Sequence, residues 1–156
     1  MKIRIIAVGK TREKFIAQAE DEYLKRLKRY TRVERVDVKP EKITGHTNDD
    51  VVRAAEWKRI SENISQGEFV ISLHSQASQM SSVKFASYVS RMMNSGRKSV
   101  VFVIGGALGL AEDGLKSSDE MLSLSSMTFT HEMVRMILLE QLYRAFTIIK
   151  GEKYHK

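Results

Sequence analysis

The sequence predicts an α/β fold: a mainly parallel sheet with helices on both faces. Short apolar runs alternate with amphipathic stretches along the whole chain, which is the pattern of βαβ units. The 156 residues contain no internal repeat, low-complexity tract or linker. A chain of this length can bury one sizeable core, so we expect a single domain over residues 1–156.

Five segments are predicted as strands. The clearest is a continuous apolar run that stops at Gly105 and Gly106, as expected for a strand buried on both faces. The other segments are rich in β-branched residues and end near a glycine, the lone Pro40 or a polar loop. In chain order the predicted strands are 3–8, 33–38, 69–73, 99–104 and 121–124.

Helices are predicted between these strands. Thr11 is the candidate cap of a helix that reaches Leu27 and places Phe15 on its apolar face. A polar loop at 41–50 precedes a helix over about 50–64, which Asn48 or Asp49 can cap. Val51 is one of its residues available for burial. The remaining predictions are a helix from Ser81 or Ser82 to about Gly96, a helical turn at 110–116 and a long helix at 131–150.

The last predicted helix is apolar around nearly its whole circumference. A surface helix needs an apolar stripe of only about 100°, and the excess must be covered by something. A second copy of the chain is the usual cover, so we expect a homodimer through this helix. A central core helix is the alternative, for which a chain of this size leaves little room.

The composition excludes several classes of protein and favours one kind of partner. The absence of cysteine excludes disulfide scaffolds, cysteine-based zinc sites, iron–sulfur clusters and thiol catalysis. The first apolar stretch stops at Gly9, which is too short for a signal peptide or a membrane span. We therefore expect a soluble cytoplasmic protein with no membrane partner. The net charge of +7 favours a polyanionic partner, most simply a nucleic acid.

Standard nucleotide and metal motifs are not met. The spacing of Gly105, Gly106 and Gly109 is not that of a dinucleotide fingerprint, and no lysine directly follows Gly114 as a phosphate loop requires. The stretch that begins at His131 lacks the second histidine of a zinc helix, so no metal site is expected. Two adjacent glycines at a strand end indicate either a plain turn or a ligand pocket. An adenosine-type cofactor without a diphosphate would suit such a pocket.

The C-terminus is the second unusual feature. The chain ends in Tyr154-His155-Lys156, which combine an aromatic ring, an imidazole and a cation. Proteins use these groups to hold a splayed-out base and its phosphates. A frayed, solvated tail is the alternative.

These features occur together in one known family. The chain contains Phe102-Val103-Ile104-Gly105-Gly106, Leu122-Ser123-Leu124-Ser125-Ser126-Met127-Thr128, Glu140-Gln141-Leu142-Tyr143-Arg144-Ala145 and the ending Tyr154-His155-Lys156. In this order they closely resemble the RlmH family, the large-subunit ribosomal RNA pseudouridine methyltransferases of the SPOUT superfamily. Its opening segments are also similar to that family, so the resemblance spans the whole chain.

The resemblance implies an α/β-knot fold with a trefoil-knotted C-terminal part, and a homodimer. It also implies S-adenosyl-L-methionine as the methyl donor and N3 of a pseudouridine in helix 69 of 23S rRNA as the acceptor. The implied cofactor-binding residues lie on strand-end loops that the strand pattern also singles out. They are Leu73, Gly105, Leu124, Ser125, Ser126, Met127, Thr128 and Phe129.

Methyl transfer to N3 requires loss of the N3 proton near neutral pH. We expect His155 to act as the base and Arg135 to lower the pKa of the acceptor. Tyr154 would stack on the target base, while Lys156 and Arg144 would contact the RNA. As an alternative, Arg135 pairs only with an acidic neighbour on its own helix, Glu132 or Glu140, and His131 only caps that helix.

Two other classes of function compete with this hypothesis. A non-enzymatic ribosome- or RNA-binding protein would explain the charge and the tail, but gives no reason for the glycine pocket. A small-molecule enzyme that uses a nucleotide would explain the pocket, but not the basic tail. Heat on titration with S-adenosylmethionine, and the need for RNA, separate these classes.

Overall fold

The computed structural model describes residues 1–155, which contain one five-stranded sheet. Its strand order is β2-β1-β4-β3-β5, and each pair of neighbouring strands is parallel. The predicted α/β class with a parallel sheet is therefore confirmed. The strands are β1 (Lys2–Val8), β2 (Val33–Val38), β3 (Phe69–Leu73), β4 (Ser99–Ile104) and β5 (Glu120–Leu122).

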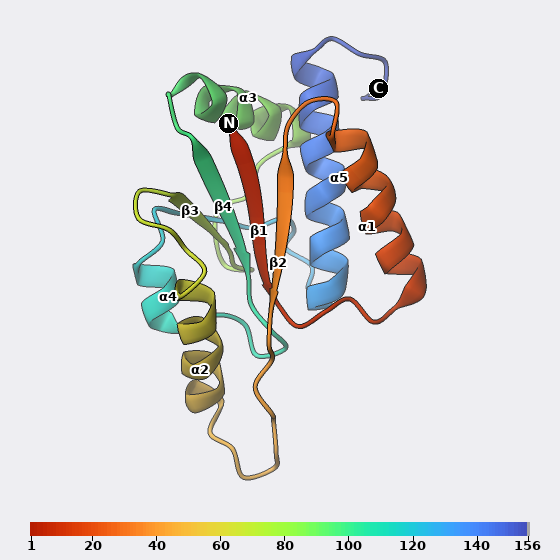
Figure 1. Ribbon diagram of the computed structural model, residues 1–156. Helices are drawn as coiled ribbons and strands as arrows, with labels where there is room; N and C mark the ends of the chain where they lie inside the picture. Colours follow the sequence, from red (N-terminus) through yellow and green to blue (C-terminus); the bar gives the residue numbers. More distant parts are fainter. Residues whose placement is uncertain (156) are drawn as a thin grey trace.

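Helices cover both faces of the sheet (Figure 1). On one face Phe102 of β4 packs in a core with side chains of α3 and α5, such as Val89 and Leu139. On the other face its neighbour Val103 packs with Ile60 of α2. This alternation along β4 is why the strand is apolar at every position. The helices are α1 (Lys14–Leu27), α2 (Asp49–Ser61), α3 (Ser82–Asn94), α4 (Glu112–Lys116) and α5 (His131–Ile149).

Side-chain caps fix the start of three helices. The carboxamide oxygen of Asn48 accepts a hydrogen bond from the Asp50 amide at 2.7 Å, which decides between the two predicted caps of α2. The Ser81 hydroxyl caps α3 in the same way, and Thr130 caps α5. These bonds satisfy amides that the first turn of a helix leaves unpaired.

The first helix departs from its prediction in two respects. It begins at Lys14, and Thr11 does not cap it, because its hydroxyl donates to the buried Glu20 at 2.7 Å. Phe15 is 67% exposed and does not face the core. The buried stripe of α1 runs through Ile16, Glu20 and Leu27, and Phe15 lies about 100° around the helix from Ile16.

The second helix shows a similar shift of its buried stripe. Val51, which we expected to be available for burial, is 61% exposed. Val52, Glu56 and Ile60 face the sheet instead. A carboxyl group thus occupies a buried position where the pattern predicts an apolar residue. The observed buried face of α2 is therefore rotated from the predicted one.

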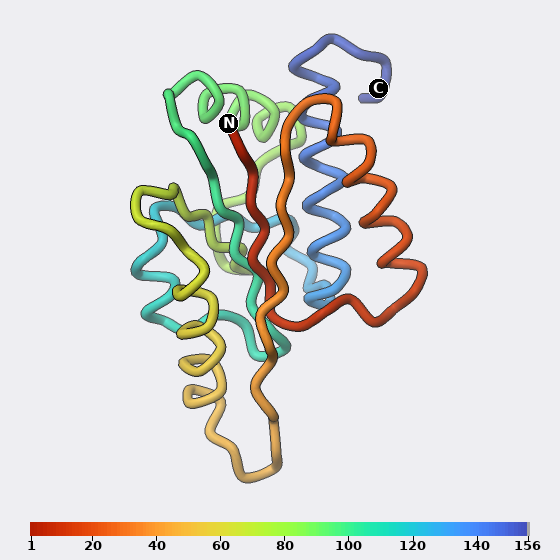
Figure 2. Tube along the Cα trace, viewed as in Figure 1, coloured from red at the N-terminus to blue at the C-terminus, as the bar shows by residue number. Residues whose placement is uncertain are grey.

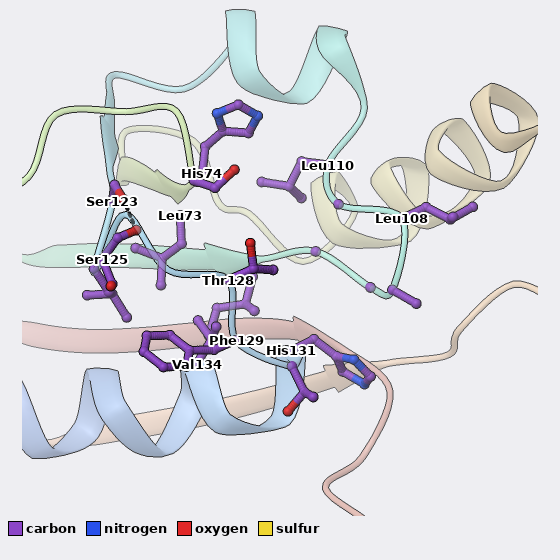
Figure 3. Close-up of a pocket in the computed structure, with 18 of the residues that line it drawn as sticks. Leu73, His74, Leu108, Leu110, Ser123, Ser125, Thr128, Phe129, His131 and Val134 are labelled. Atoms are coloured by element: carbon purple, nitrogen blue, oxygen red, sulfur yellow. Dashed lines mark hydrogen bonds between the residues drawn. The ribbon is translucent and has the colours of Figure 1, made fainter.

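The last strand is shorter than predicted. It ends at Leu122, which pairs with Leu73 of β3, so Leu124 belongs to the following loop. That loop crosses the carboxyl end of the sheet before α5 begins (Figure 3). The trefoil knot implied by the resemblance stays a prediction, since strand order alone does not define it.

The chain that follows α5 turns back toward the end of α1 (Figure 2). Arg29, just beyond α1, forms an ion pair with Glu152, just beyond α5. Within residues 1–155 no helix is both long and apolar enough to cross a bilayer.

Candidate functional site

A cavity of about 690 Å³ lies at the carboxyl ends of the central strands (Figure 3). Three stretches of chain line it: 73–75 after β3, 104–110 after β4, and 122–131 without residue 126. Val134 of α5 closes one side. The volume is within the range of small-molecule sites, and this edge of a parallel sheet is where such sites form.

The glycine loop after β4 is folded tightly on itself. The Gly109 amide donates to the Gly106 carbonyl at 3.0 Å. A Cβ atom on Gly105 would lie 2.6 Å from the carbonyl carbon of Gly109, closer than any side chain tolerates. The turn therefore needs glycine at 105, and it places backbone groups rather than side chains at the cavity wall.

The loop after β5 forms the facing wall. The Ser123 hydroxyl donates to the Ser125 carbonyl at 2.9 Å, and the Ser125 hydroxyl accepts from the Met127 amide at 3.0 Å. These two bonds hold the loop in a turn. The serines in this stretch therefore shape the backbone at the cavity and are not arranged as nucleophiles.

The cavity gathers most of the residues expected to bind the cofactor. Ser126 is the exception, because it is not among the lining residues. Sequence reasoning missed His131 and Val134 as cavity residues, since they reach it only when the loop before α5 crosses the sheet. The expected cofactor-binding residues that line the cavity are Leu73, Gly105, Leu124, Ser125, Met127, Thr128 and Phe129.

The cavity carries little charge. Among residues 1–155 no Lys or Arg lines it, and its titratable lining groups are His74 and His131. Burial, with the nearby Arg135 guanidinium, lowers the pKa of His131, so its imidazole is neutral at physiological pH. Among residues 1–155 no three His, Asp or Glu side chains are grouped as metal ligands. The cavity thus offers backbone, hydroxyl and apolar contacts, and no cationic side chain for a phosphate.

Arg135 does not point into this cavity. The residue is 2% exposed, and its guanidinium donates to the Val8 carbonyl and, at 3.3 Å, to Asp37. The alternative partners on its own helix do not bind it, because Glu132 accepts the Arg12 and Glu13 amides and Glu140 binds the tail. Arg135 ties α5 to the ends of β1 and β2.

The tail lies at the other end of α5. The Tyr154 hydroxyl donates to Glu140 at 3.1 Å, and its ring meets the Tyr143 ring edge-on at a centroid distance of 4.8 Å. The Arg144 guanidinium lies 4.9 Å from the centre of the Tyr154 ring and 3.4 Å from Nδ1 of His155. Lys156 lies outside the described residues. Arg144, Tyr154 and His155 are therefore brought together, but apart from the cavity.

The distance between tail and cavity follows from the helix. Tyr154 contacts α5 at Glu140, nine residues beyond His131, which is a rise of about 14 Å. Neither Tyr154 nor His155 lines the cavity. Figure 1 shows the C-terminus near the end of α5 opposite to the loop that enters it. One chain does not bring its own tail to its own cavity.

A family model and full-length relatives both identify the same family for this chain. The family model described as "Predicted SPOUT methyltransferase" matches residues 1–155. Proteins named "Ribosomal RNA large subunit methyltransferase H" from Clostridium kluyveri, Halothermothrix orenii and Bacillus cereus are 42%, 45% and 43% identical over 159 aligned residues. Each alignment covers 100% of both chains.

Solved structures share the fold at low identity. A probable methylase family protein from Haemophilus influenzae superposes with a TM-score of 0.58 at 16% identity, covering 99% of this chain and 70% of that one. The tRNA (m1G37) methyltransferase of Aquifex aeolicus superposes with a TM-score of 0.55 at 13% identity, covering 92% and 70%. Together with the full-length match, these findings establish that the chain is an enzyme of the SPOUT methyltransferase family and belongs to the RlmH group within it.

Proposed function

We propose that this protein methylates 23S ribosomal RNA at N3 of a pseudouridine in helix 69, with S-adenosyl-L-methionine as the methyl donor. The observation that carries the proposal is the cavity built from the glycine loop and the serine loop, whose described lining residues include no Lys or Arg. It lies where the resemblance expects the donor. The curated relatives are named for methylation of large-subunit ribosomal RNA.

The cavity suits this donor chemically. When bound, S-adenosylmethionine supplies a methyl group already activated on a sulfonium. It is a cation without phosphate, so a lining without Lys or Arg does not repel it. The backbone at Gly105 and Thr128 would hold the nucleoside, and Leu73 and Phe129 would contact its apolar surface. The protein's main task is to align donor and acceptor.

The acceptor needs help to lose its N3 proton, and we assign that task to His155. Guanidinium nitrogens only donate, so the Arg144 contact makes Nδ1 of His155 the acceptor. A neutral imidazole held this way carries its proton on Nε2. His155 can accept the N3 proton at Nδ1 only after the Arg144 contact opens. RNA binding can open it, because a phosphate competes for Arg144.

The site becomes complete when a second copy contributes the tail. A reacting pair must approach to about 3–3.5 Å, whereas Tyr154 contacts its own α5 far from the cavity. Apolar side chains of α5 remain only half-buried in one chain, among them Met133, Met136 and Ile137. We propose that they form a homodimer interface that places each tail at the partner's cavity.

Basic residues surround the proposed acceptor site. Arg26 and Arg29 lie beside Tyr143 and Tyr30, and Arg144 lies over Tyr154. With Lys156 they give the tail region the cations and rings that bind an exposed base and its phosphates. This substrate places the protein in the cytoplasm with the ribosome.

Two measurements test the proposal. Calorimetric titration of the protein with S-adenosylmethionine should give a saturable heat. Mass spectrometry of a helix 69 fragment should show one extra methyl group on pseudouridine after incubation of unmethylated ribosomes with protein and donor. Binding of RNA without any heat from the donor would contradict the enzyme and favour a ribosome-binding protein. Methylation at another nucleotide would agree with the enzyme class but contradict the proposed methylation site in helix 69.

A further inference from the structure

Glu56 occupies an unusual position on α2. It lies between Val52 and Ile60 on the buried stripe of the helix and is 4% exposed. One carboxyl oxygen, Oε1, accepts the Glu41 amide at 3.0 Å, while Oε2 has no hydrogen-bond partner among the described residues. Burying a half-satisfied carboxyl group destabilises the folded state. Packing alone would favour an apolar side chain here.

The carboxyl group lies directly behind the cavity wall. A Cβ atom on Gly106 would be 2.7 Å from Oε2 and 3.1 Å from Oε1. Gly106 lines the cavity, whereas Glu56 does not. Glu56 therefore supports the glycine loop from the face opposite to the ligand.

Two neighbours on α2 hold the same stretch of chain. The Arg53 guanidinium donates to the Leu108 carbonyl at 3.3 Å. The Trp57 ring packs against Gly114, where a Cβ atom would lie 2.7 Å from Cε3. Figure 3 shows the loop of Leu108 and Leu110 between the cavity and a helix in the colour of α2. The helix thus contacts this loop and the middle of α4 at successive points.

We propose that Glu56 is a positioning residue for the methyl donor: it fixes the glycine loop through Gly106 and links it to the start of the β2–α2 loop at Glu41. This inference rests on the proposed function, because the donor is the ligand that the loop would hold. It gives the destabilising carboxyl group at this position a role. The loop contacts its ligand through backbone groups, so a small displacement of Gly106 would disturb binding directly.

Three variants separate positioning from stability. Glu56→Met removes the carboxyl group and keeps the length of the side chain. Glu56→Gln keeps the acceptor for the Glu41 amide, and burial already raises the pKa of Glu56 toward the neutral form that glutamine mimics. Ile60→Ala is the matched control, because it opens a cavity on the same buried stripe one turn further along.

The readouts are the Kd for S-adenosylmethionine and the Tm of the ligand-free protein. We expect Glu56→Met to weaken binding about tenfold without lowering the Tm, and Glu56→Gln to stay within about twofold of the unchanged protein. Ile60→Ala should lower the Tm and leave the Kd unchanged. Binding by Glu56→Met as tight as that of the unchanged protein overturns the inference. Equal weakening by Ile60→Ala overturns it too.

Failure of the proposed function gives a different result. If the unchanged protein binds no S-adenosylmethionine, the donor assignment is wrong, and the positioning role is then decided without ligand. The amide of Gly109, which donates to the Gly106 carbonyl, should exchange with deuterium about tenfold faster in Glu56→Met than in Ile60→Ala. Equal exchange rates in the two variants would contradict a role of Glu56 in holding the loop.

Discussion

The two ends of α5 differ in almost every chemical respect. At the N-terminal end, Thr130, His131 and Val134 border a cavity of backbone turns, and no Lys or Arg of the described part of the chain lines it. At the other end, the tail folds onto α5 as a compact group of rings and guanidinium groups, including Tyr154 and Arg144. The first end suits a small cation, and the second suits RNA.

The separation of these two ends is the basis of the proposed homodimer. The tail docks on α5 at Glu140, about 14 Å along the helix from His131, which keeps the proposed donor and acceptor groups of one chain apart. Packing two copies against each other brings unlike ends together without any change in the fold. We propose this arrangement as the origin of the complete site, and the four predictions below probe its two ends.

Deletion of residues 154–156 has the largest expected effect. Methyl transfer should fall about 10³-fold or more, because the stacking ring and the imidazole are both lost. The Kd for S-adenosylmethionine should remain within about twofold, since the tail does not line the cavity. Single-turnover methylation and calorimetry measure the two quantities. An intact dimer with unchanged methyl transfer would show that the tail end has no part in the reaction.

Gly105→Ala should damage the opposite end. The new Cβ would lie 2.6 Å from the Gly109 carbonyl carbon, which must shift the turn and destabilise the protein by about 1–3 kcal/mol. We expect donor affinity to fall about a hundredfold. Gly45→Ala is the matched control, because a Cβ there meets nothing within 4 Å and the residue has no positive φ. If the two variants bind the donor equally well, the glycine turn is not part of its site.

Mixing the two damaged proteins tests which subunit supplies the tail. Random exchange of Gly105→Ala chains with chains lacking residues 154–156 puts one intact cavity opposite one intact tail in half of the dimers. If each tail serves the partner's cavity, about a quarter of the unchanged activity returns. If each tail serves its own cavity, no activity returns. Activity before and after subunit exchange distinguishes these cases.

The smallest expected effect concerns pH at the cavity end. Burial and Arg135 lower the pKa of His131, so the unfolded chain binds this proton more readily than the folded chain. Protonation therefore favours the unfolded chain, and the free energy of unfolding decreases as the pH falls through the ordinary histidine range. Between about pH 7.5 and about pH 5.5, the Tm of the unchanged protein should drop a few degrees more than that of His131→Gln. Parallel Tm curves for the two proteins would contradict this assignment.

Local patterns were sufficient for most of the architecture. The strand boundaries at β2, β3 and β4 agree with their predictions because each strand has a clear apolar run and a stop signal. The rotation of α1 and α2 was less predictable. Phe15 and Val51 are apolar but exposed, while Glu20 and Glu56 are polar but buried. The hydrogen-bond partners of these two carboxyl groups, Thr11 for Glu20 and the Glu41 amide for Glu56, lie in other segments of the chain, which periodicity does not reveal.

The candidate site, too, could be predicted from the sequence only in part. Strand ends and glycine spacing indicated where the cavity lies, and the family resemblance indicated which residues line it. Arg135 shows the limit of this reasoning, because its partners Val8 and Asp37 belong to other elements. A guanidinium near the predicted site looked available to a substrate, yet folding directs it to a carbonyl and a carboxylate behind the cavity wall.

The sequence by itself determined the fold class, the family and the chemical contrast between a glycine turn and an aromatic, basic tail. These depend on residue type and spacing along the chain. Only the tertiary structure decided that Ser126 lies outside the cavity lining, that His131 lies within it, and that the tail docks at Glu140. The physical reason is that these facts depend on how the loop before α5 crosses the sheet and how α5 separates its two ends. Both are set by packing between segments far apart in the chain.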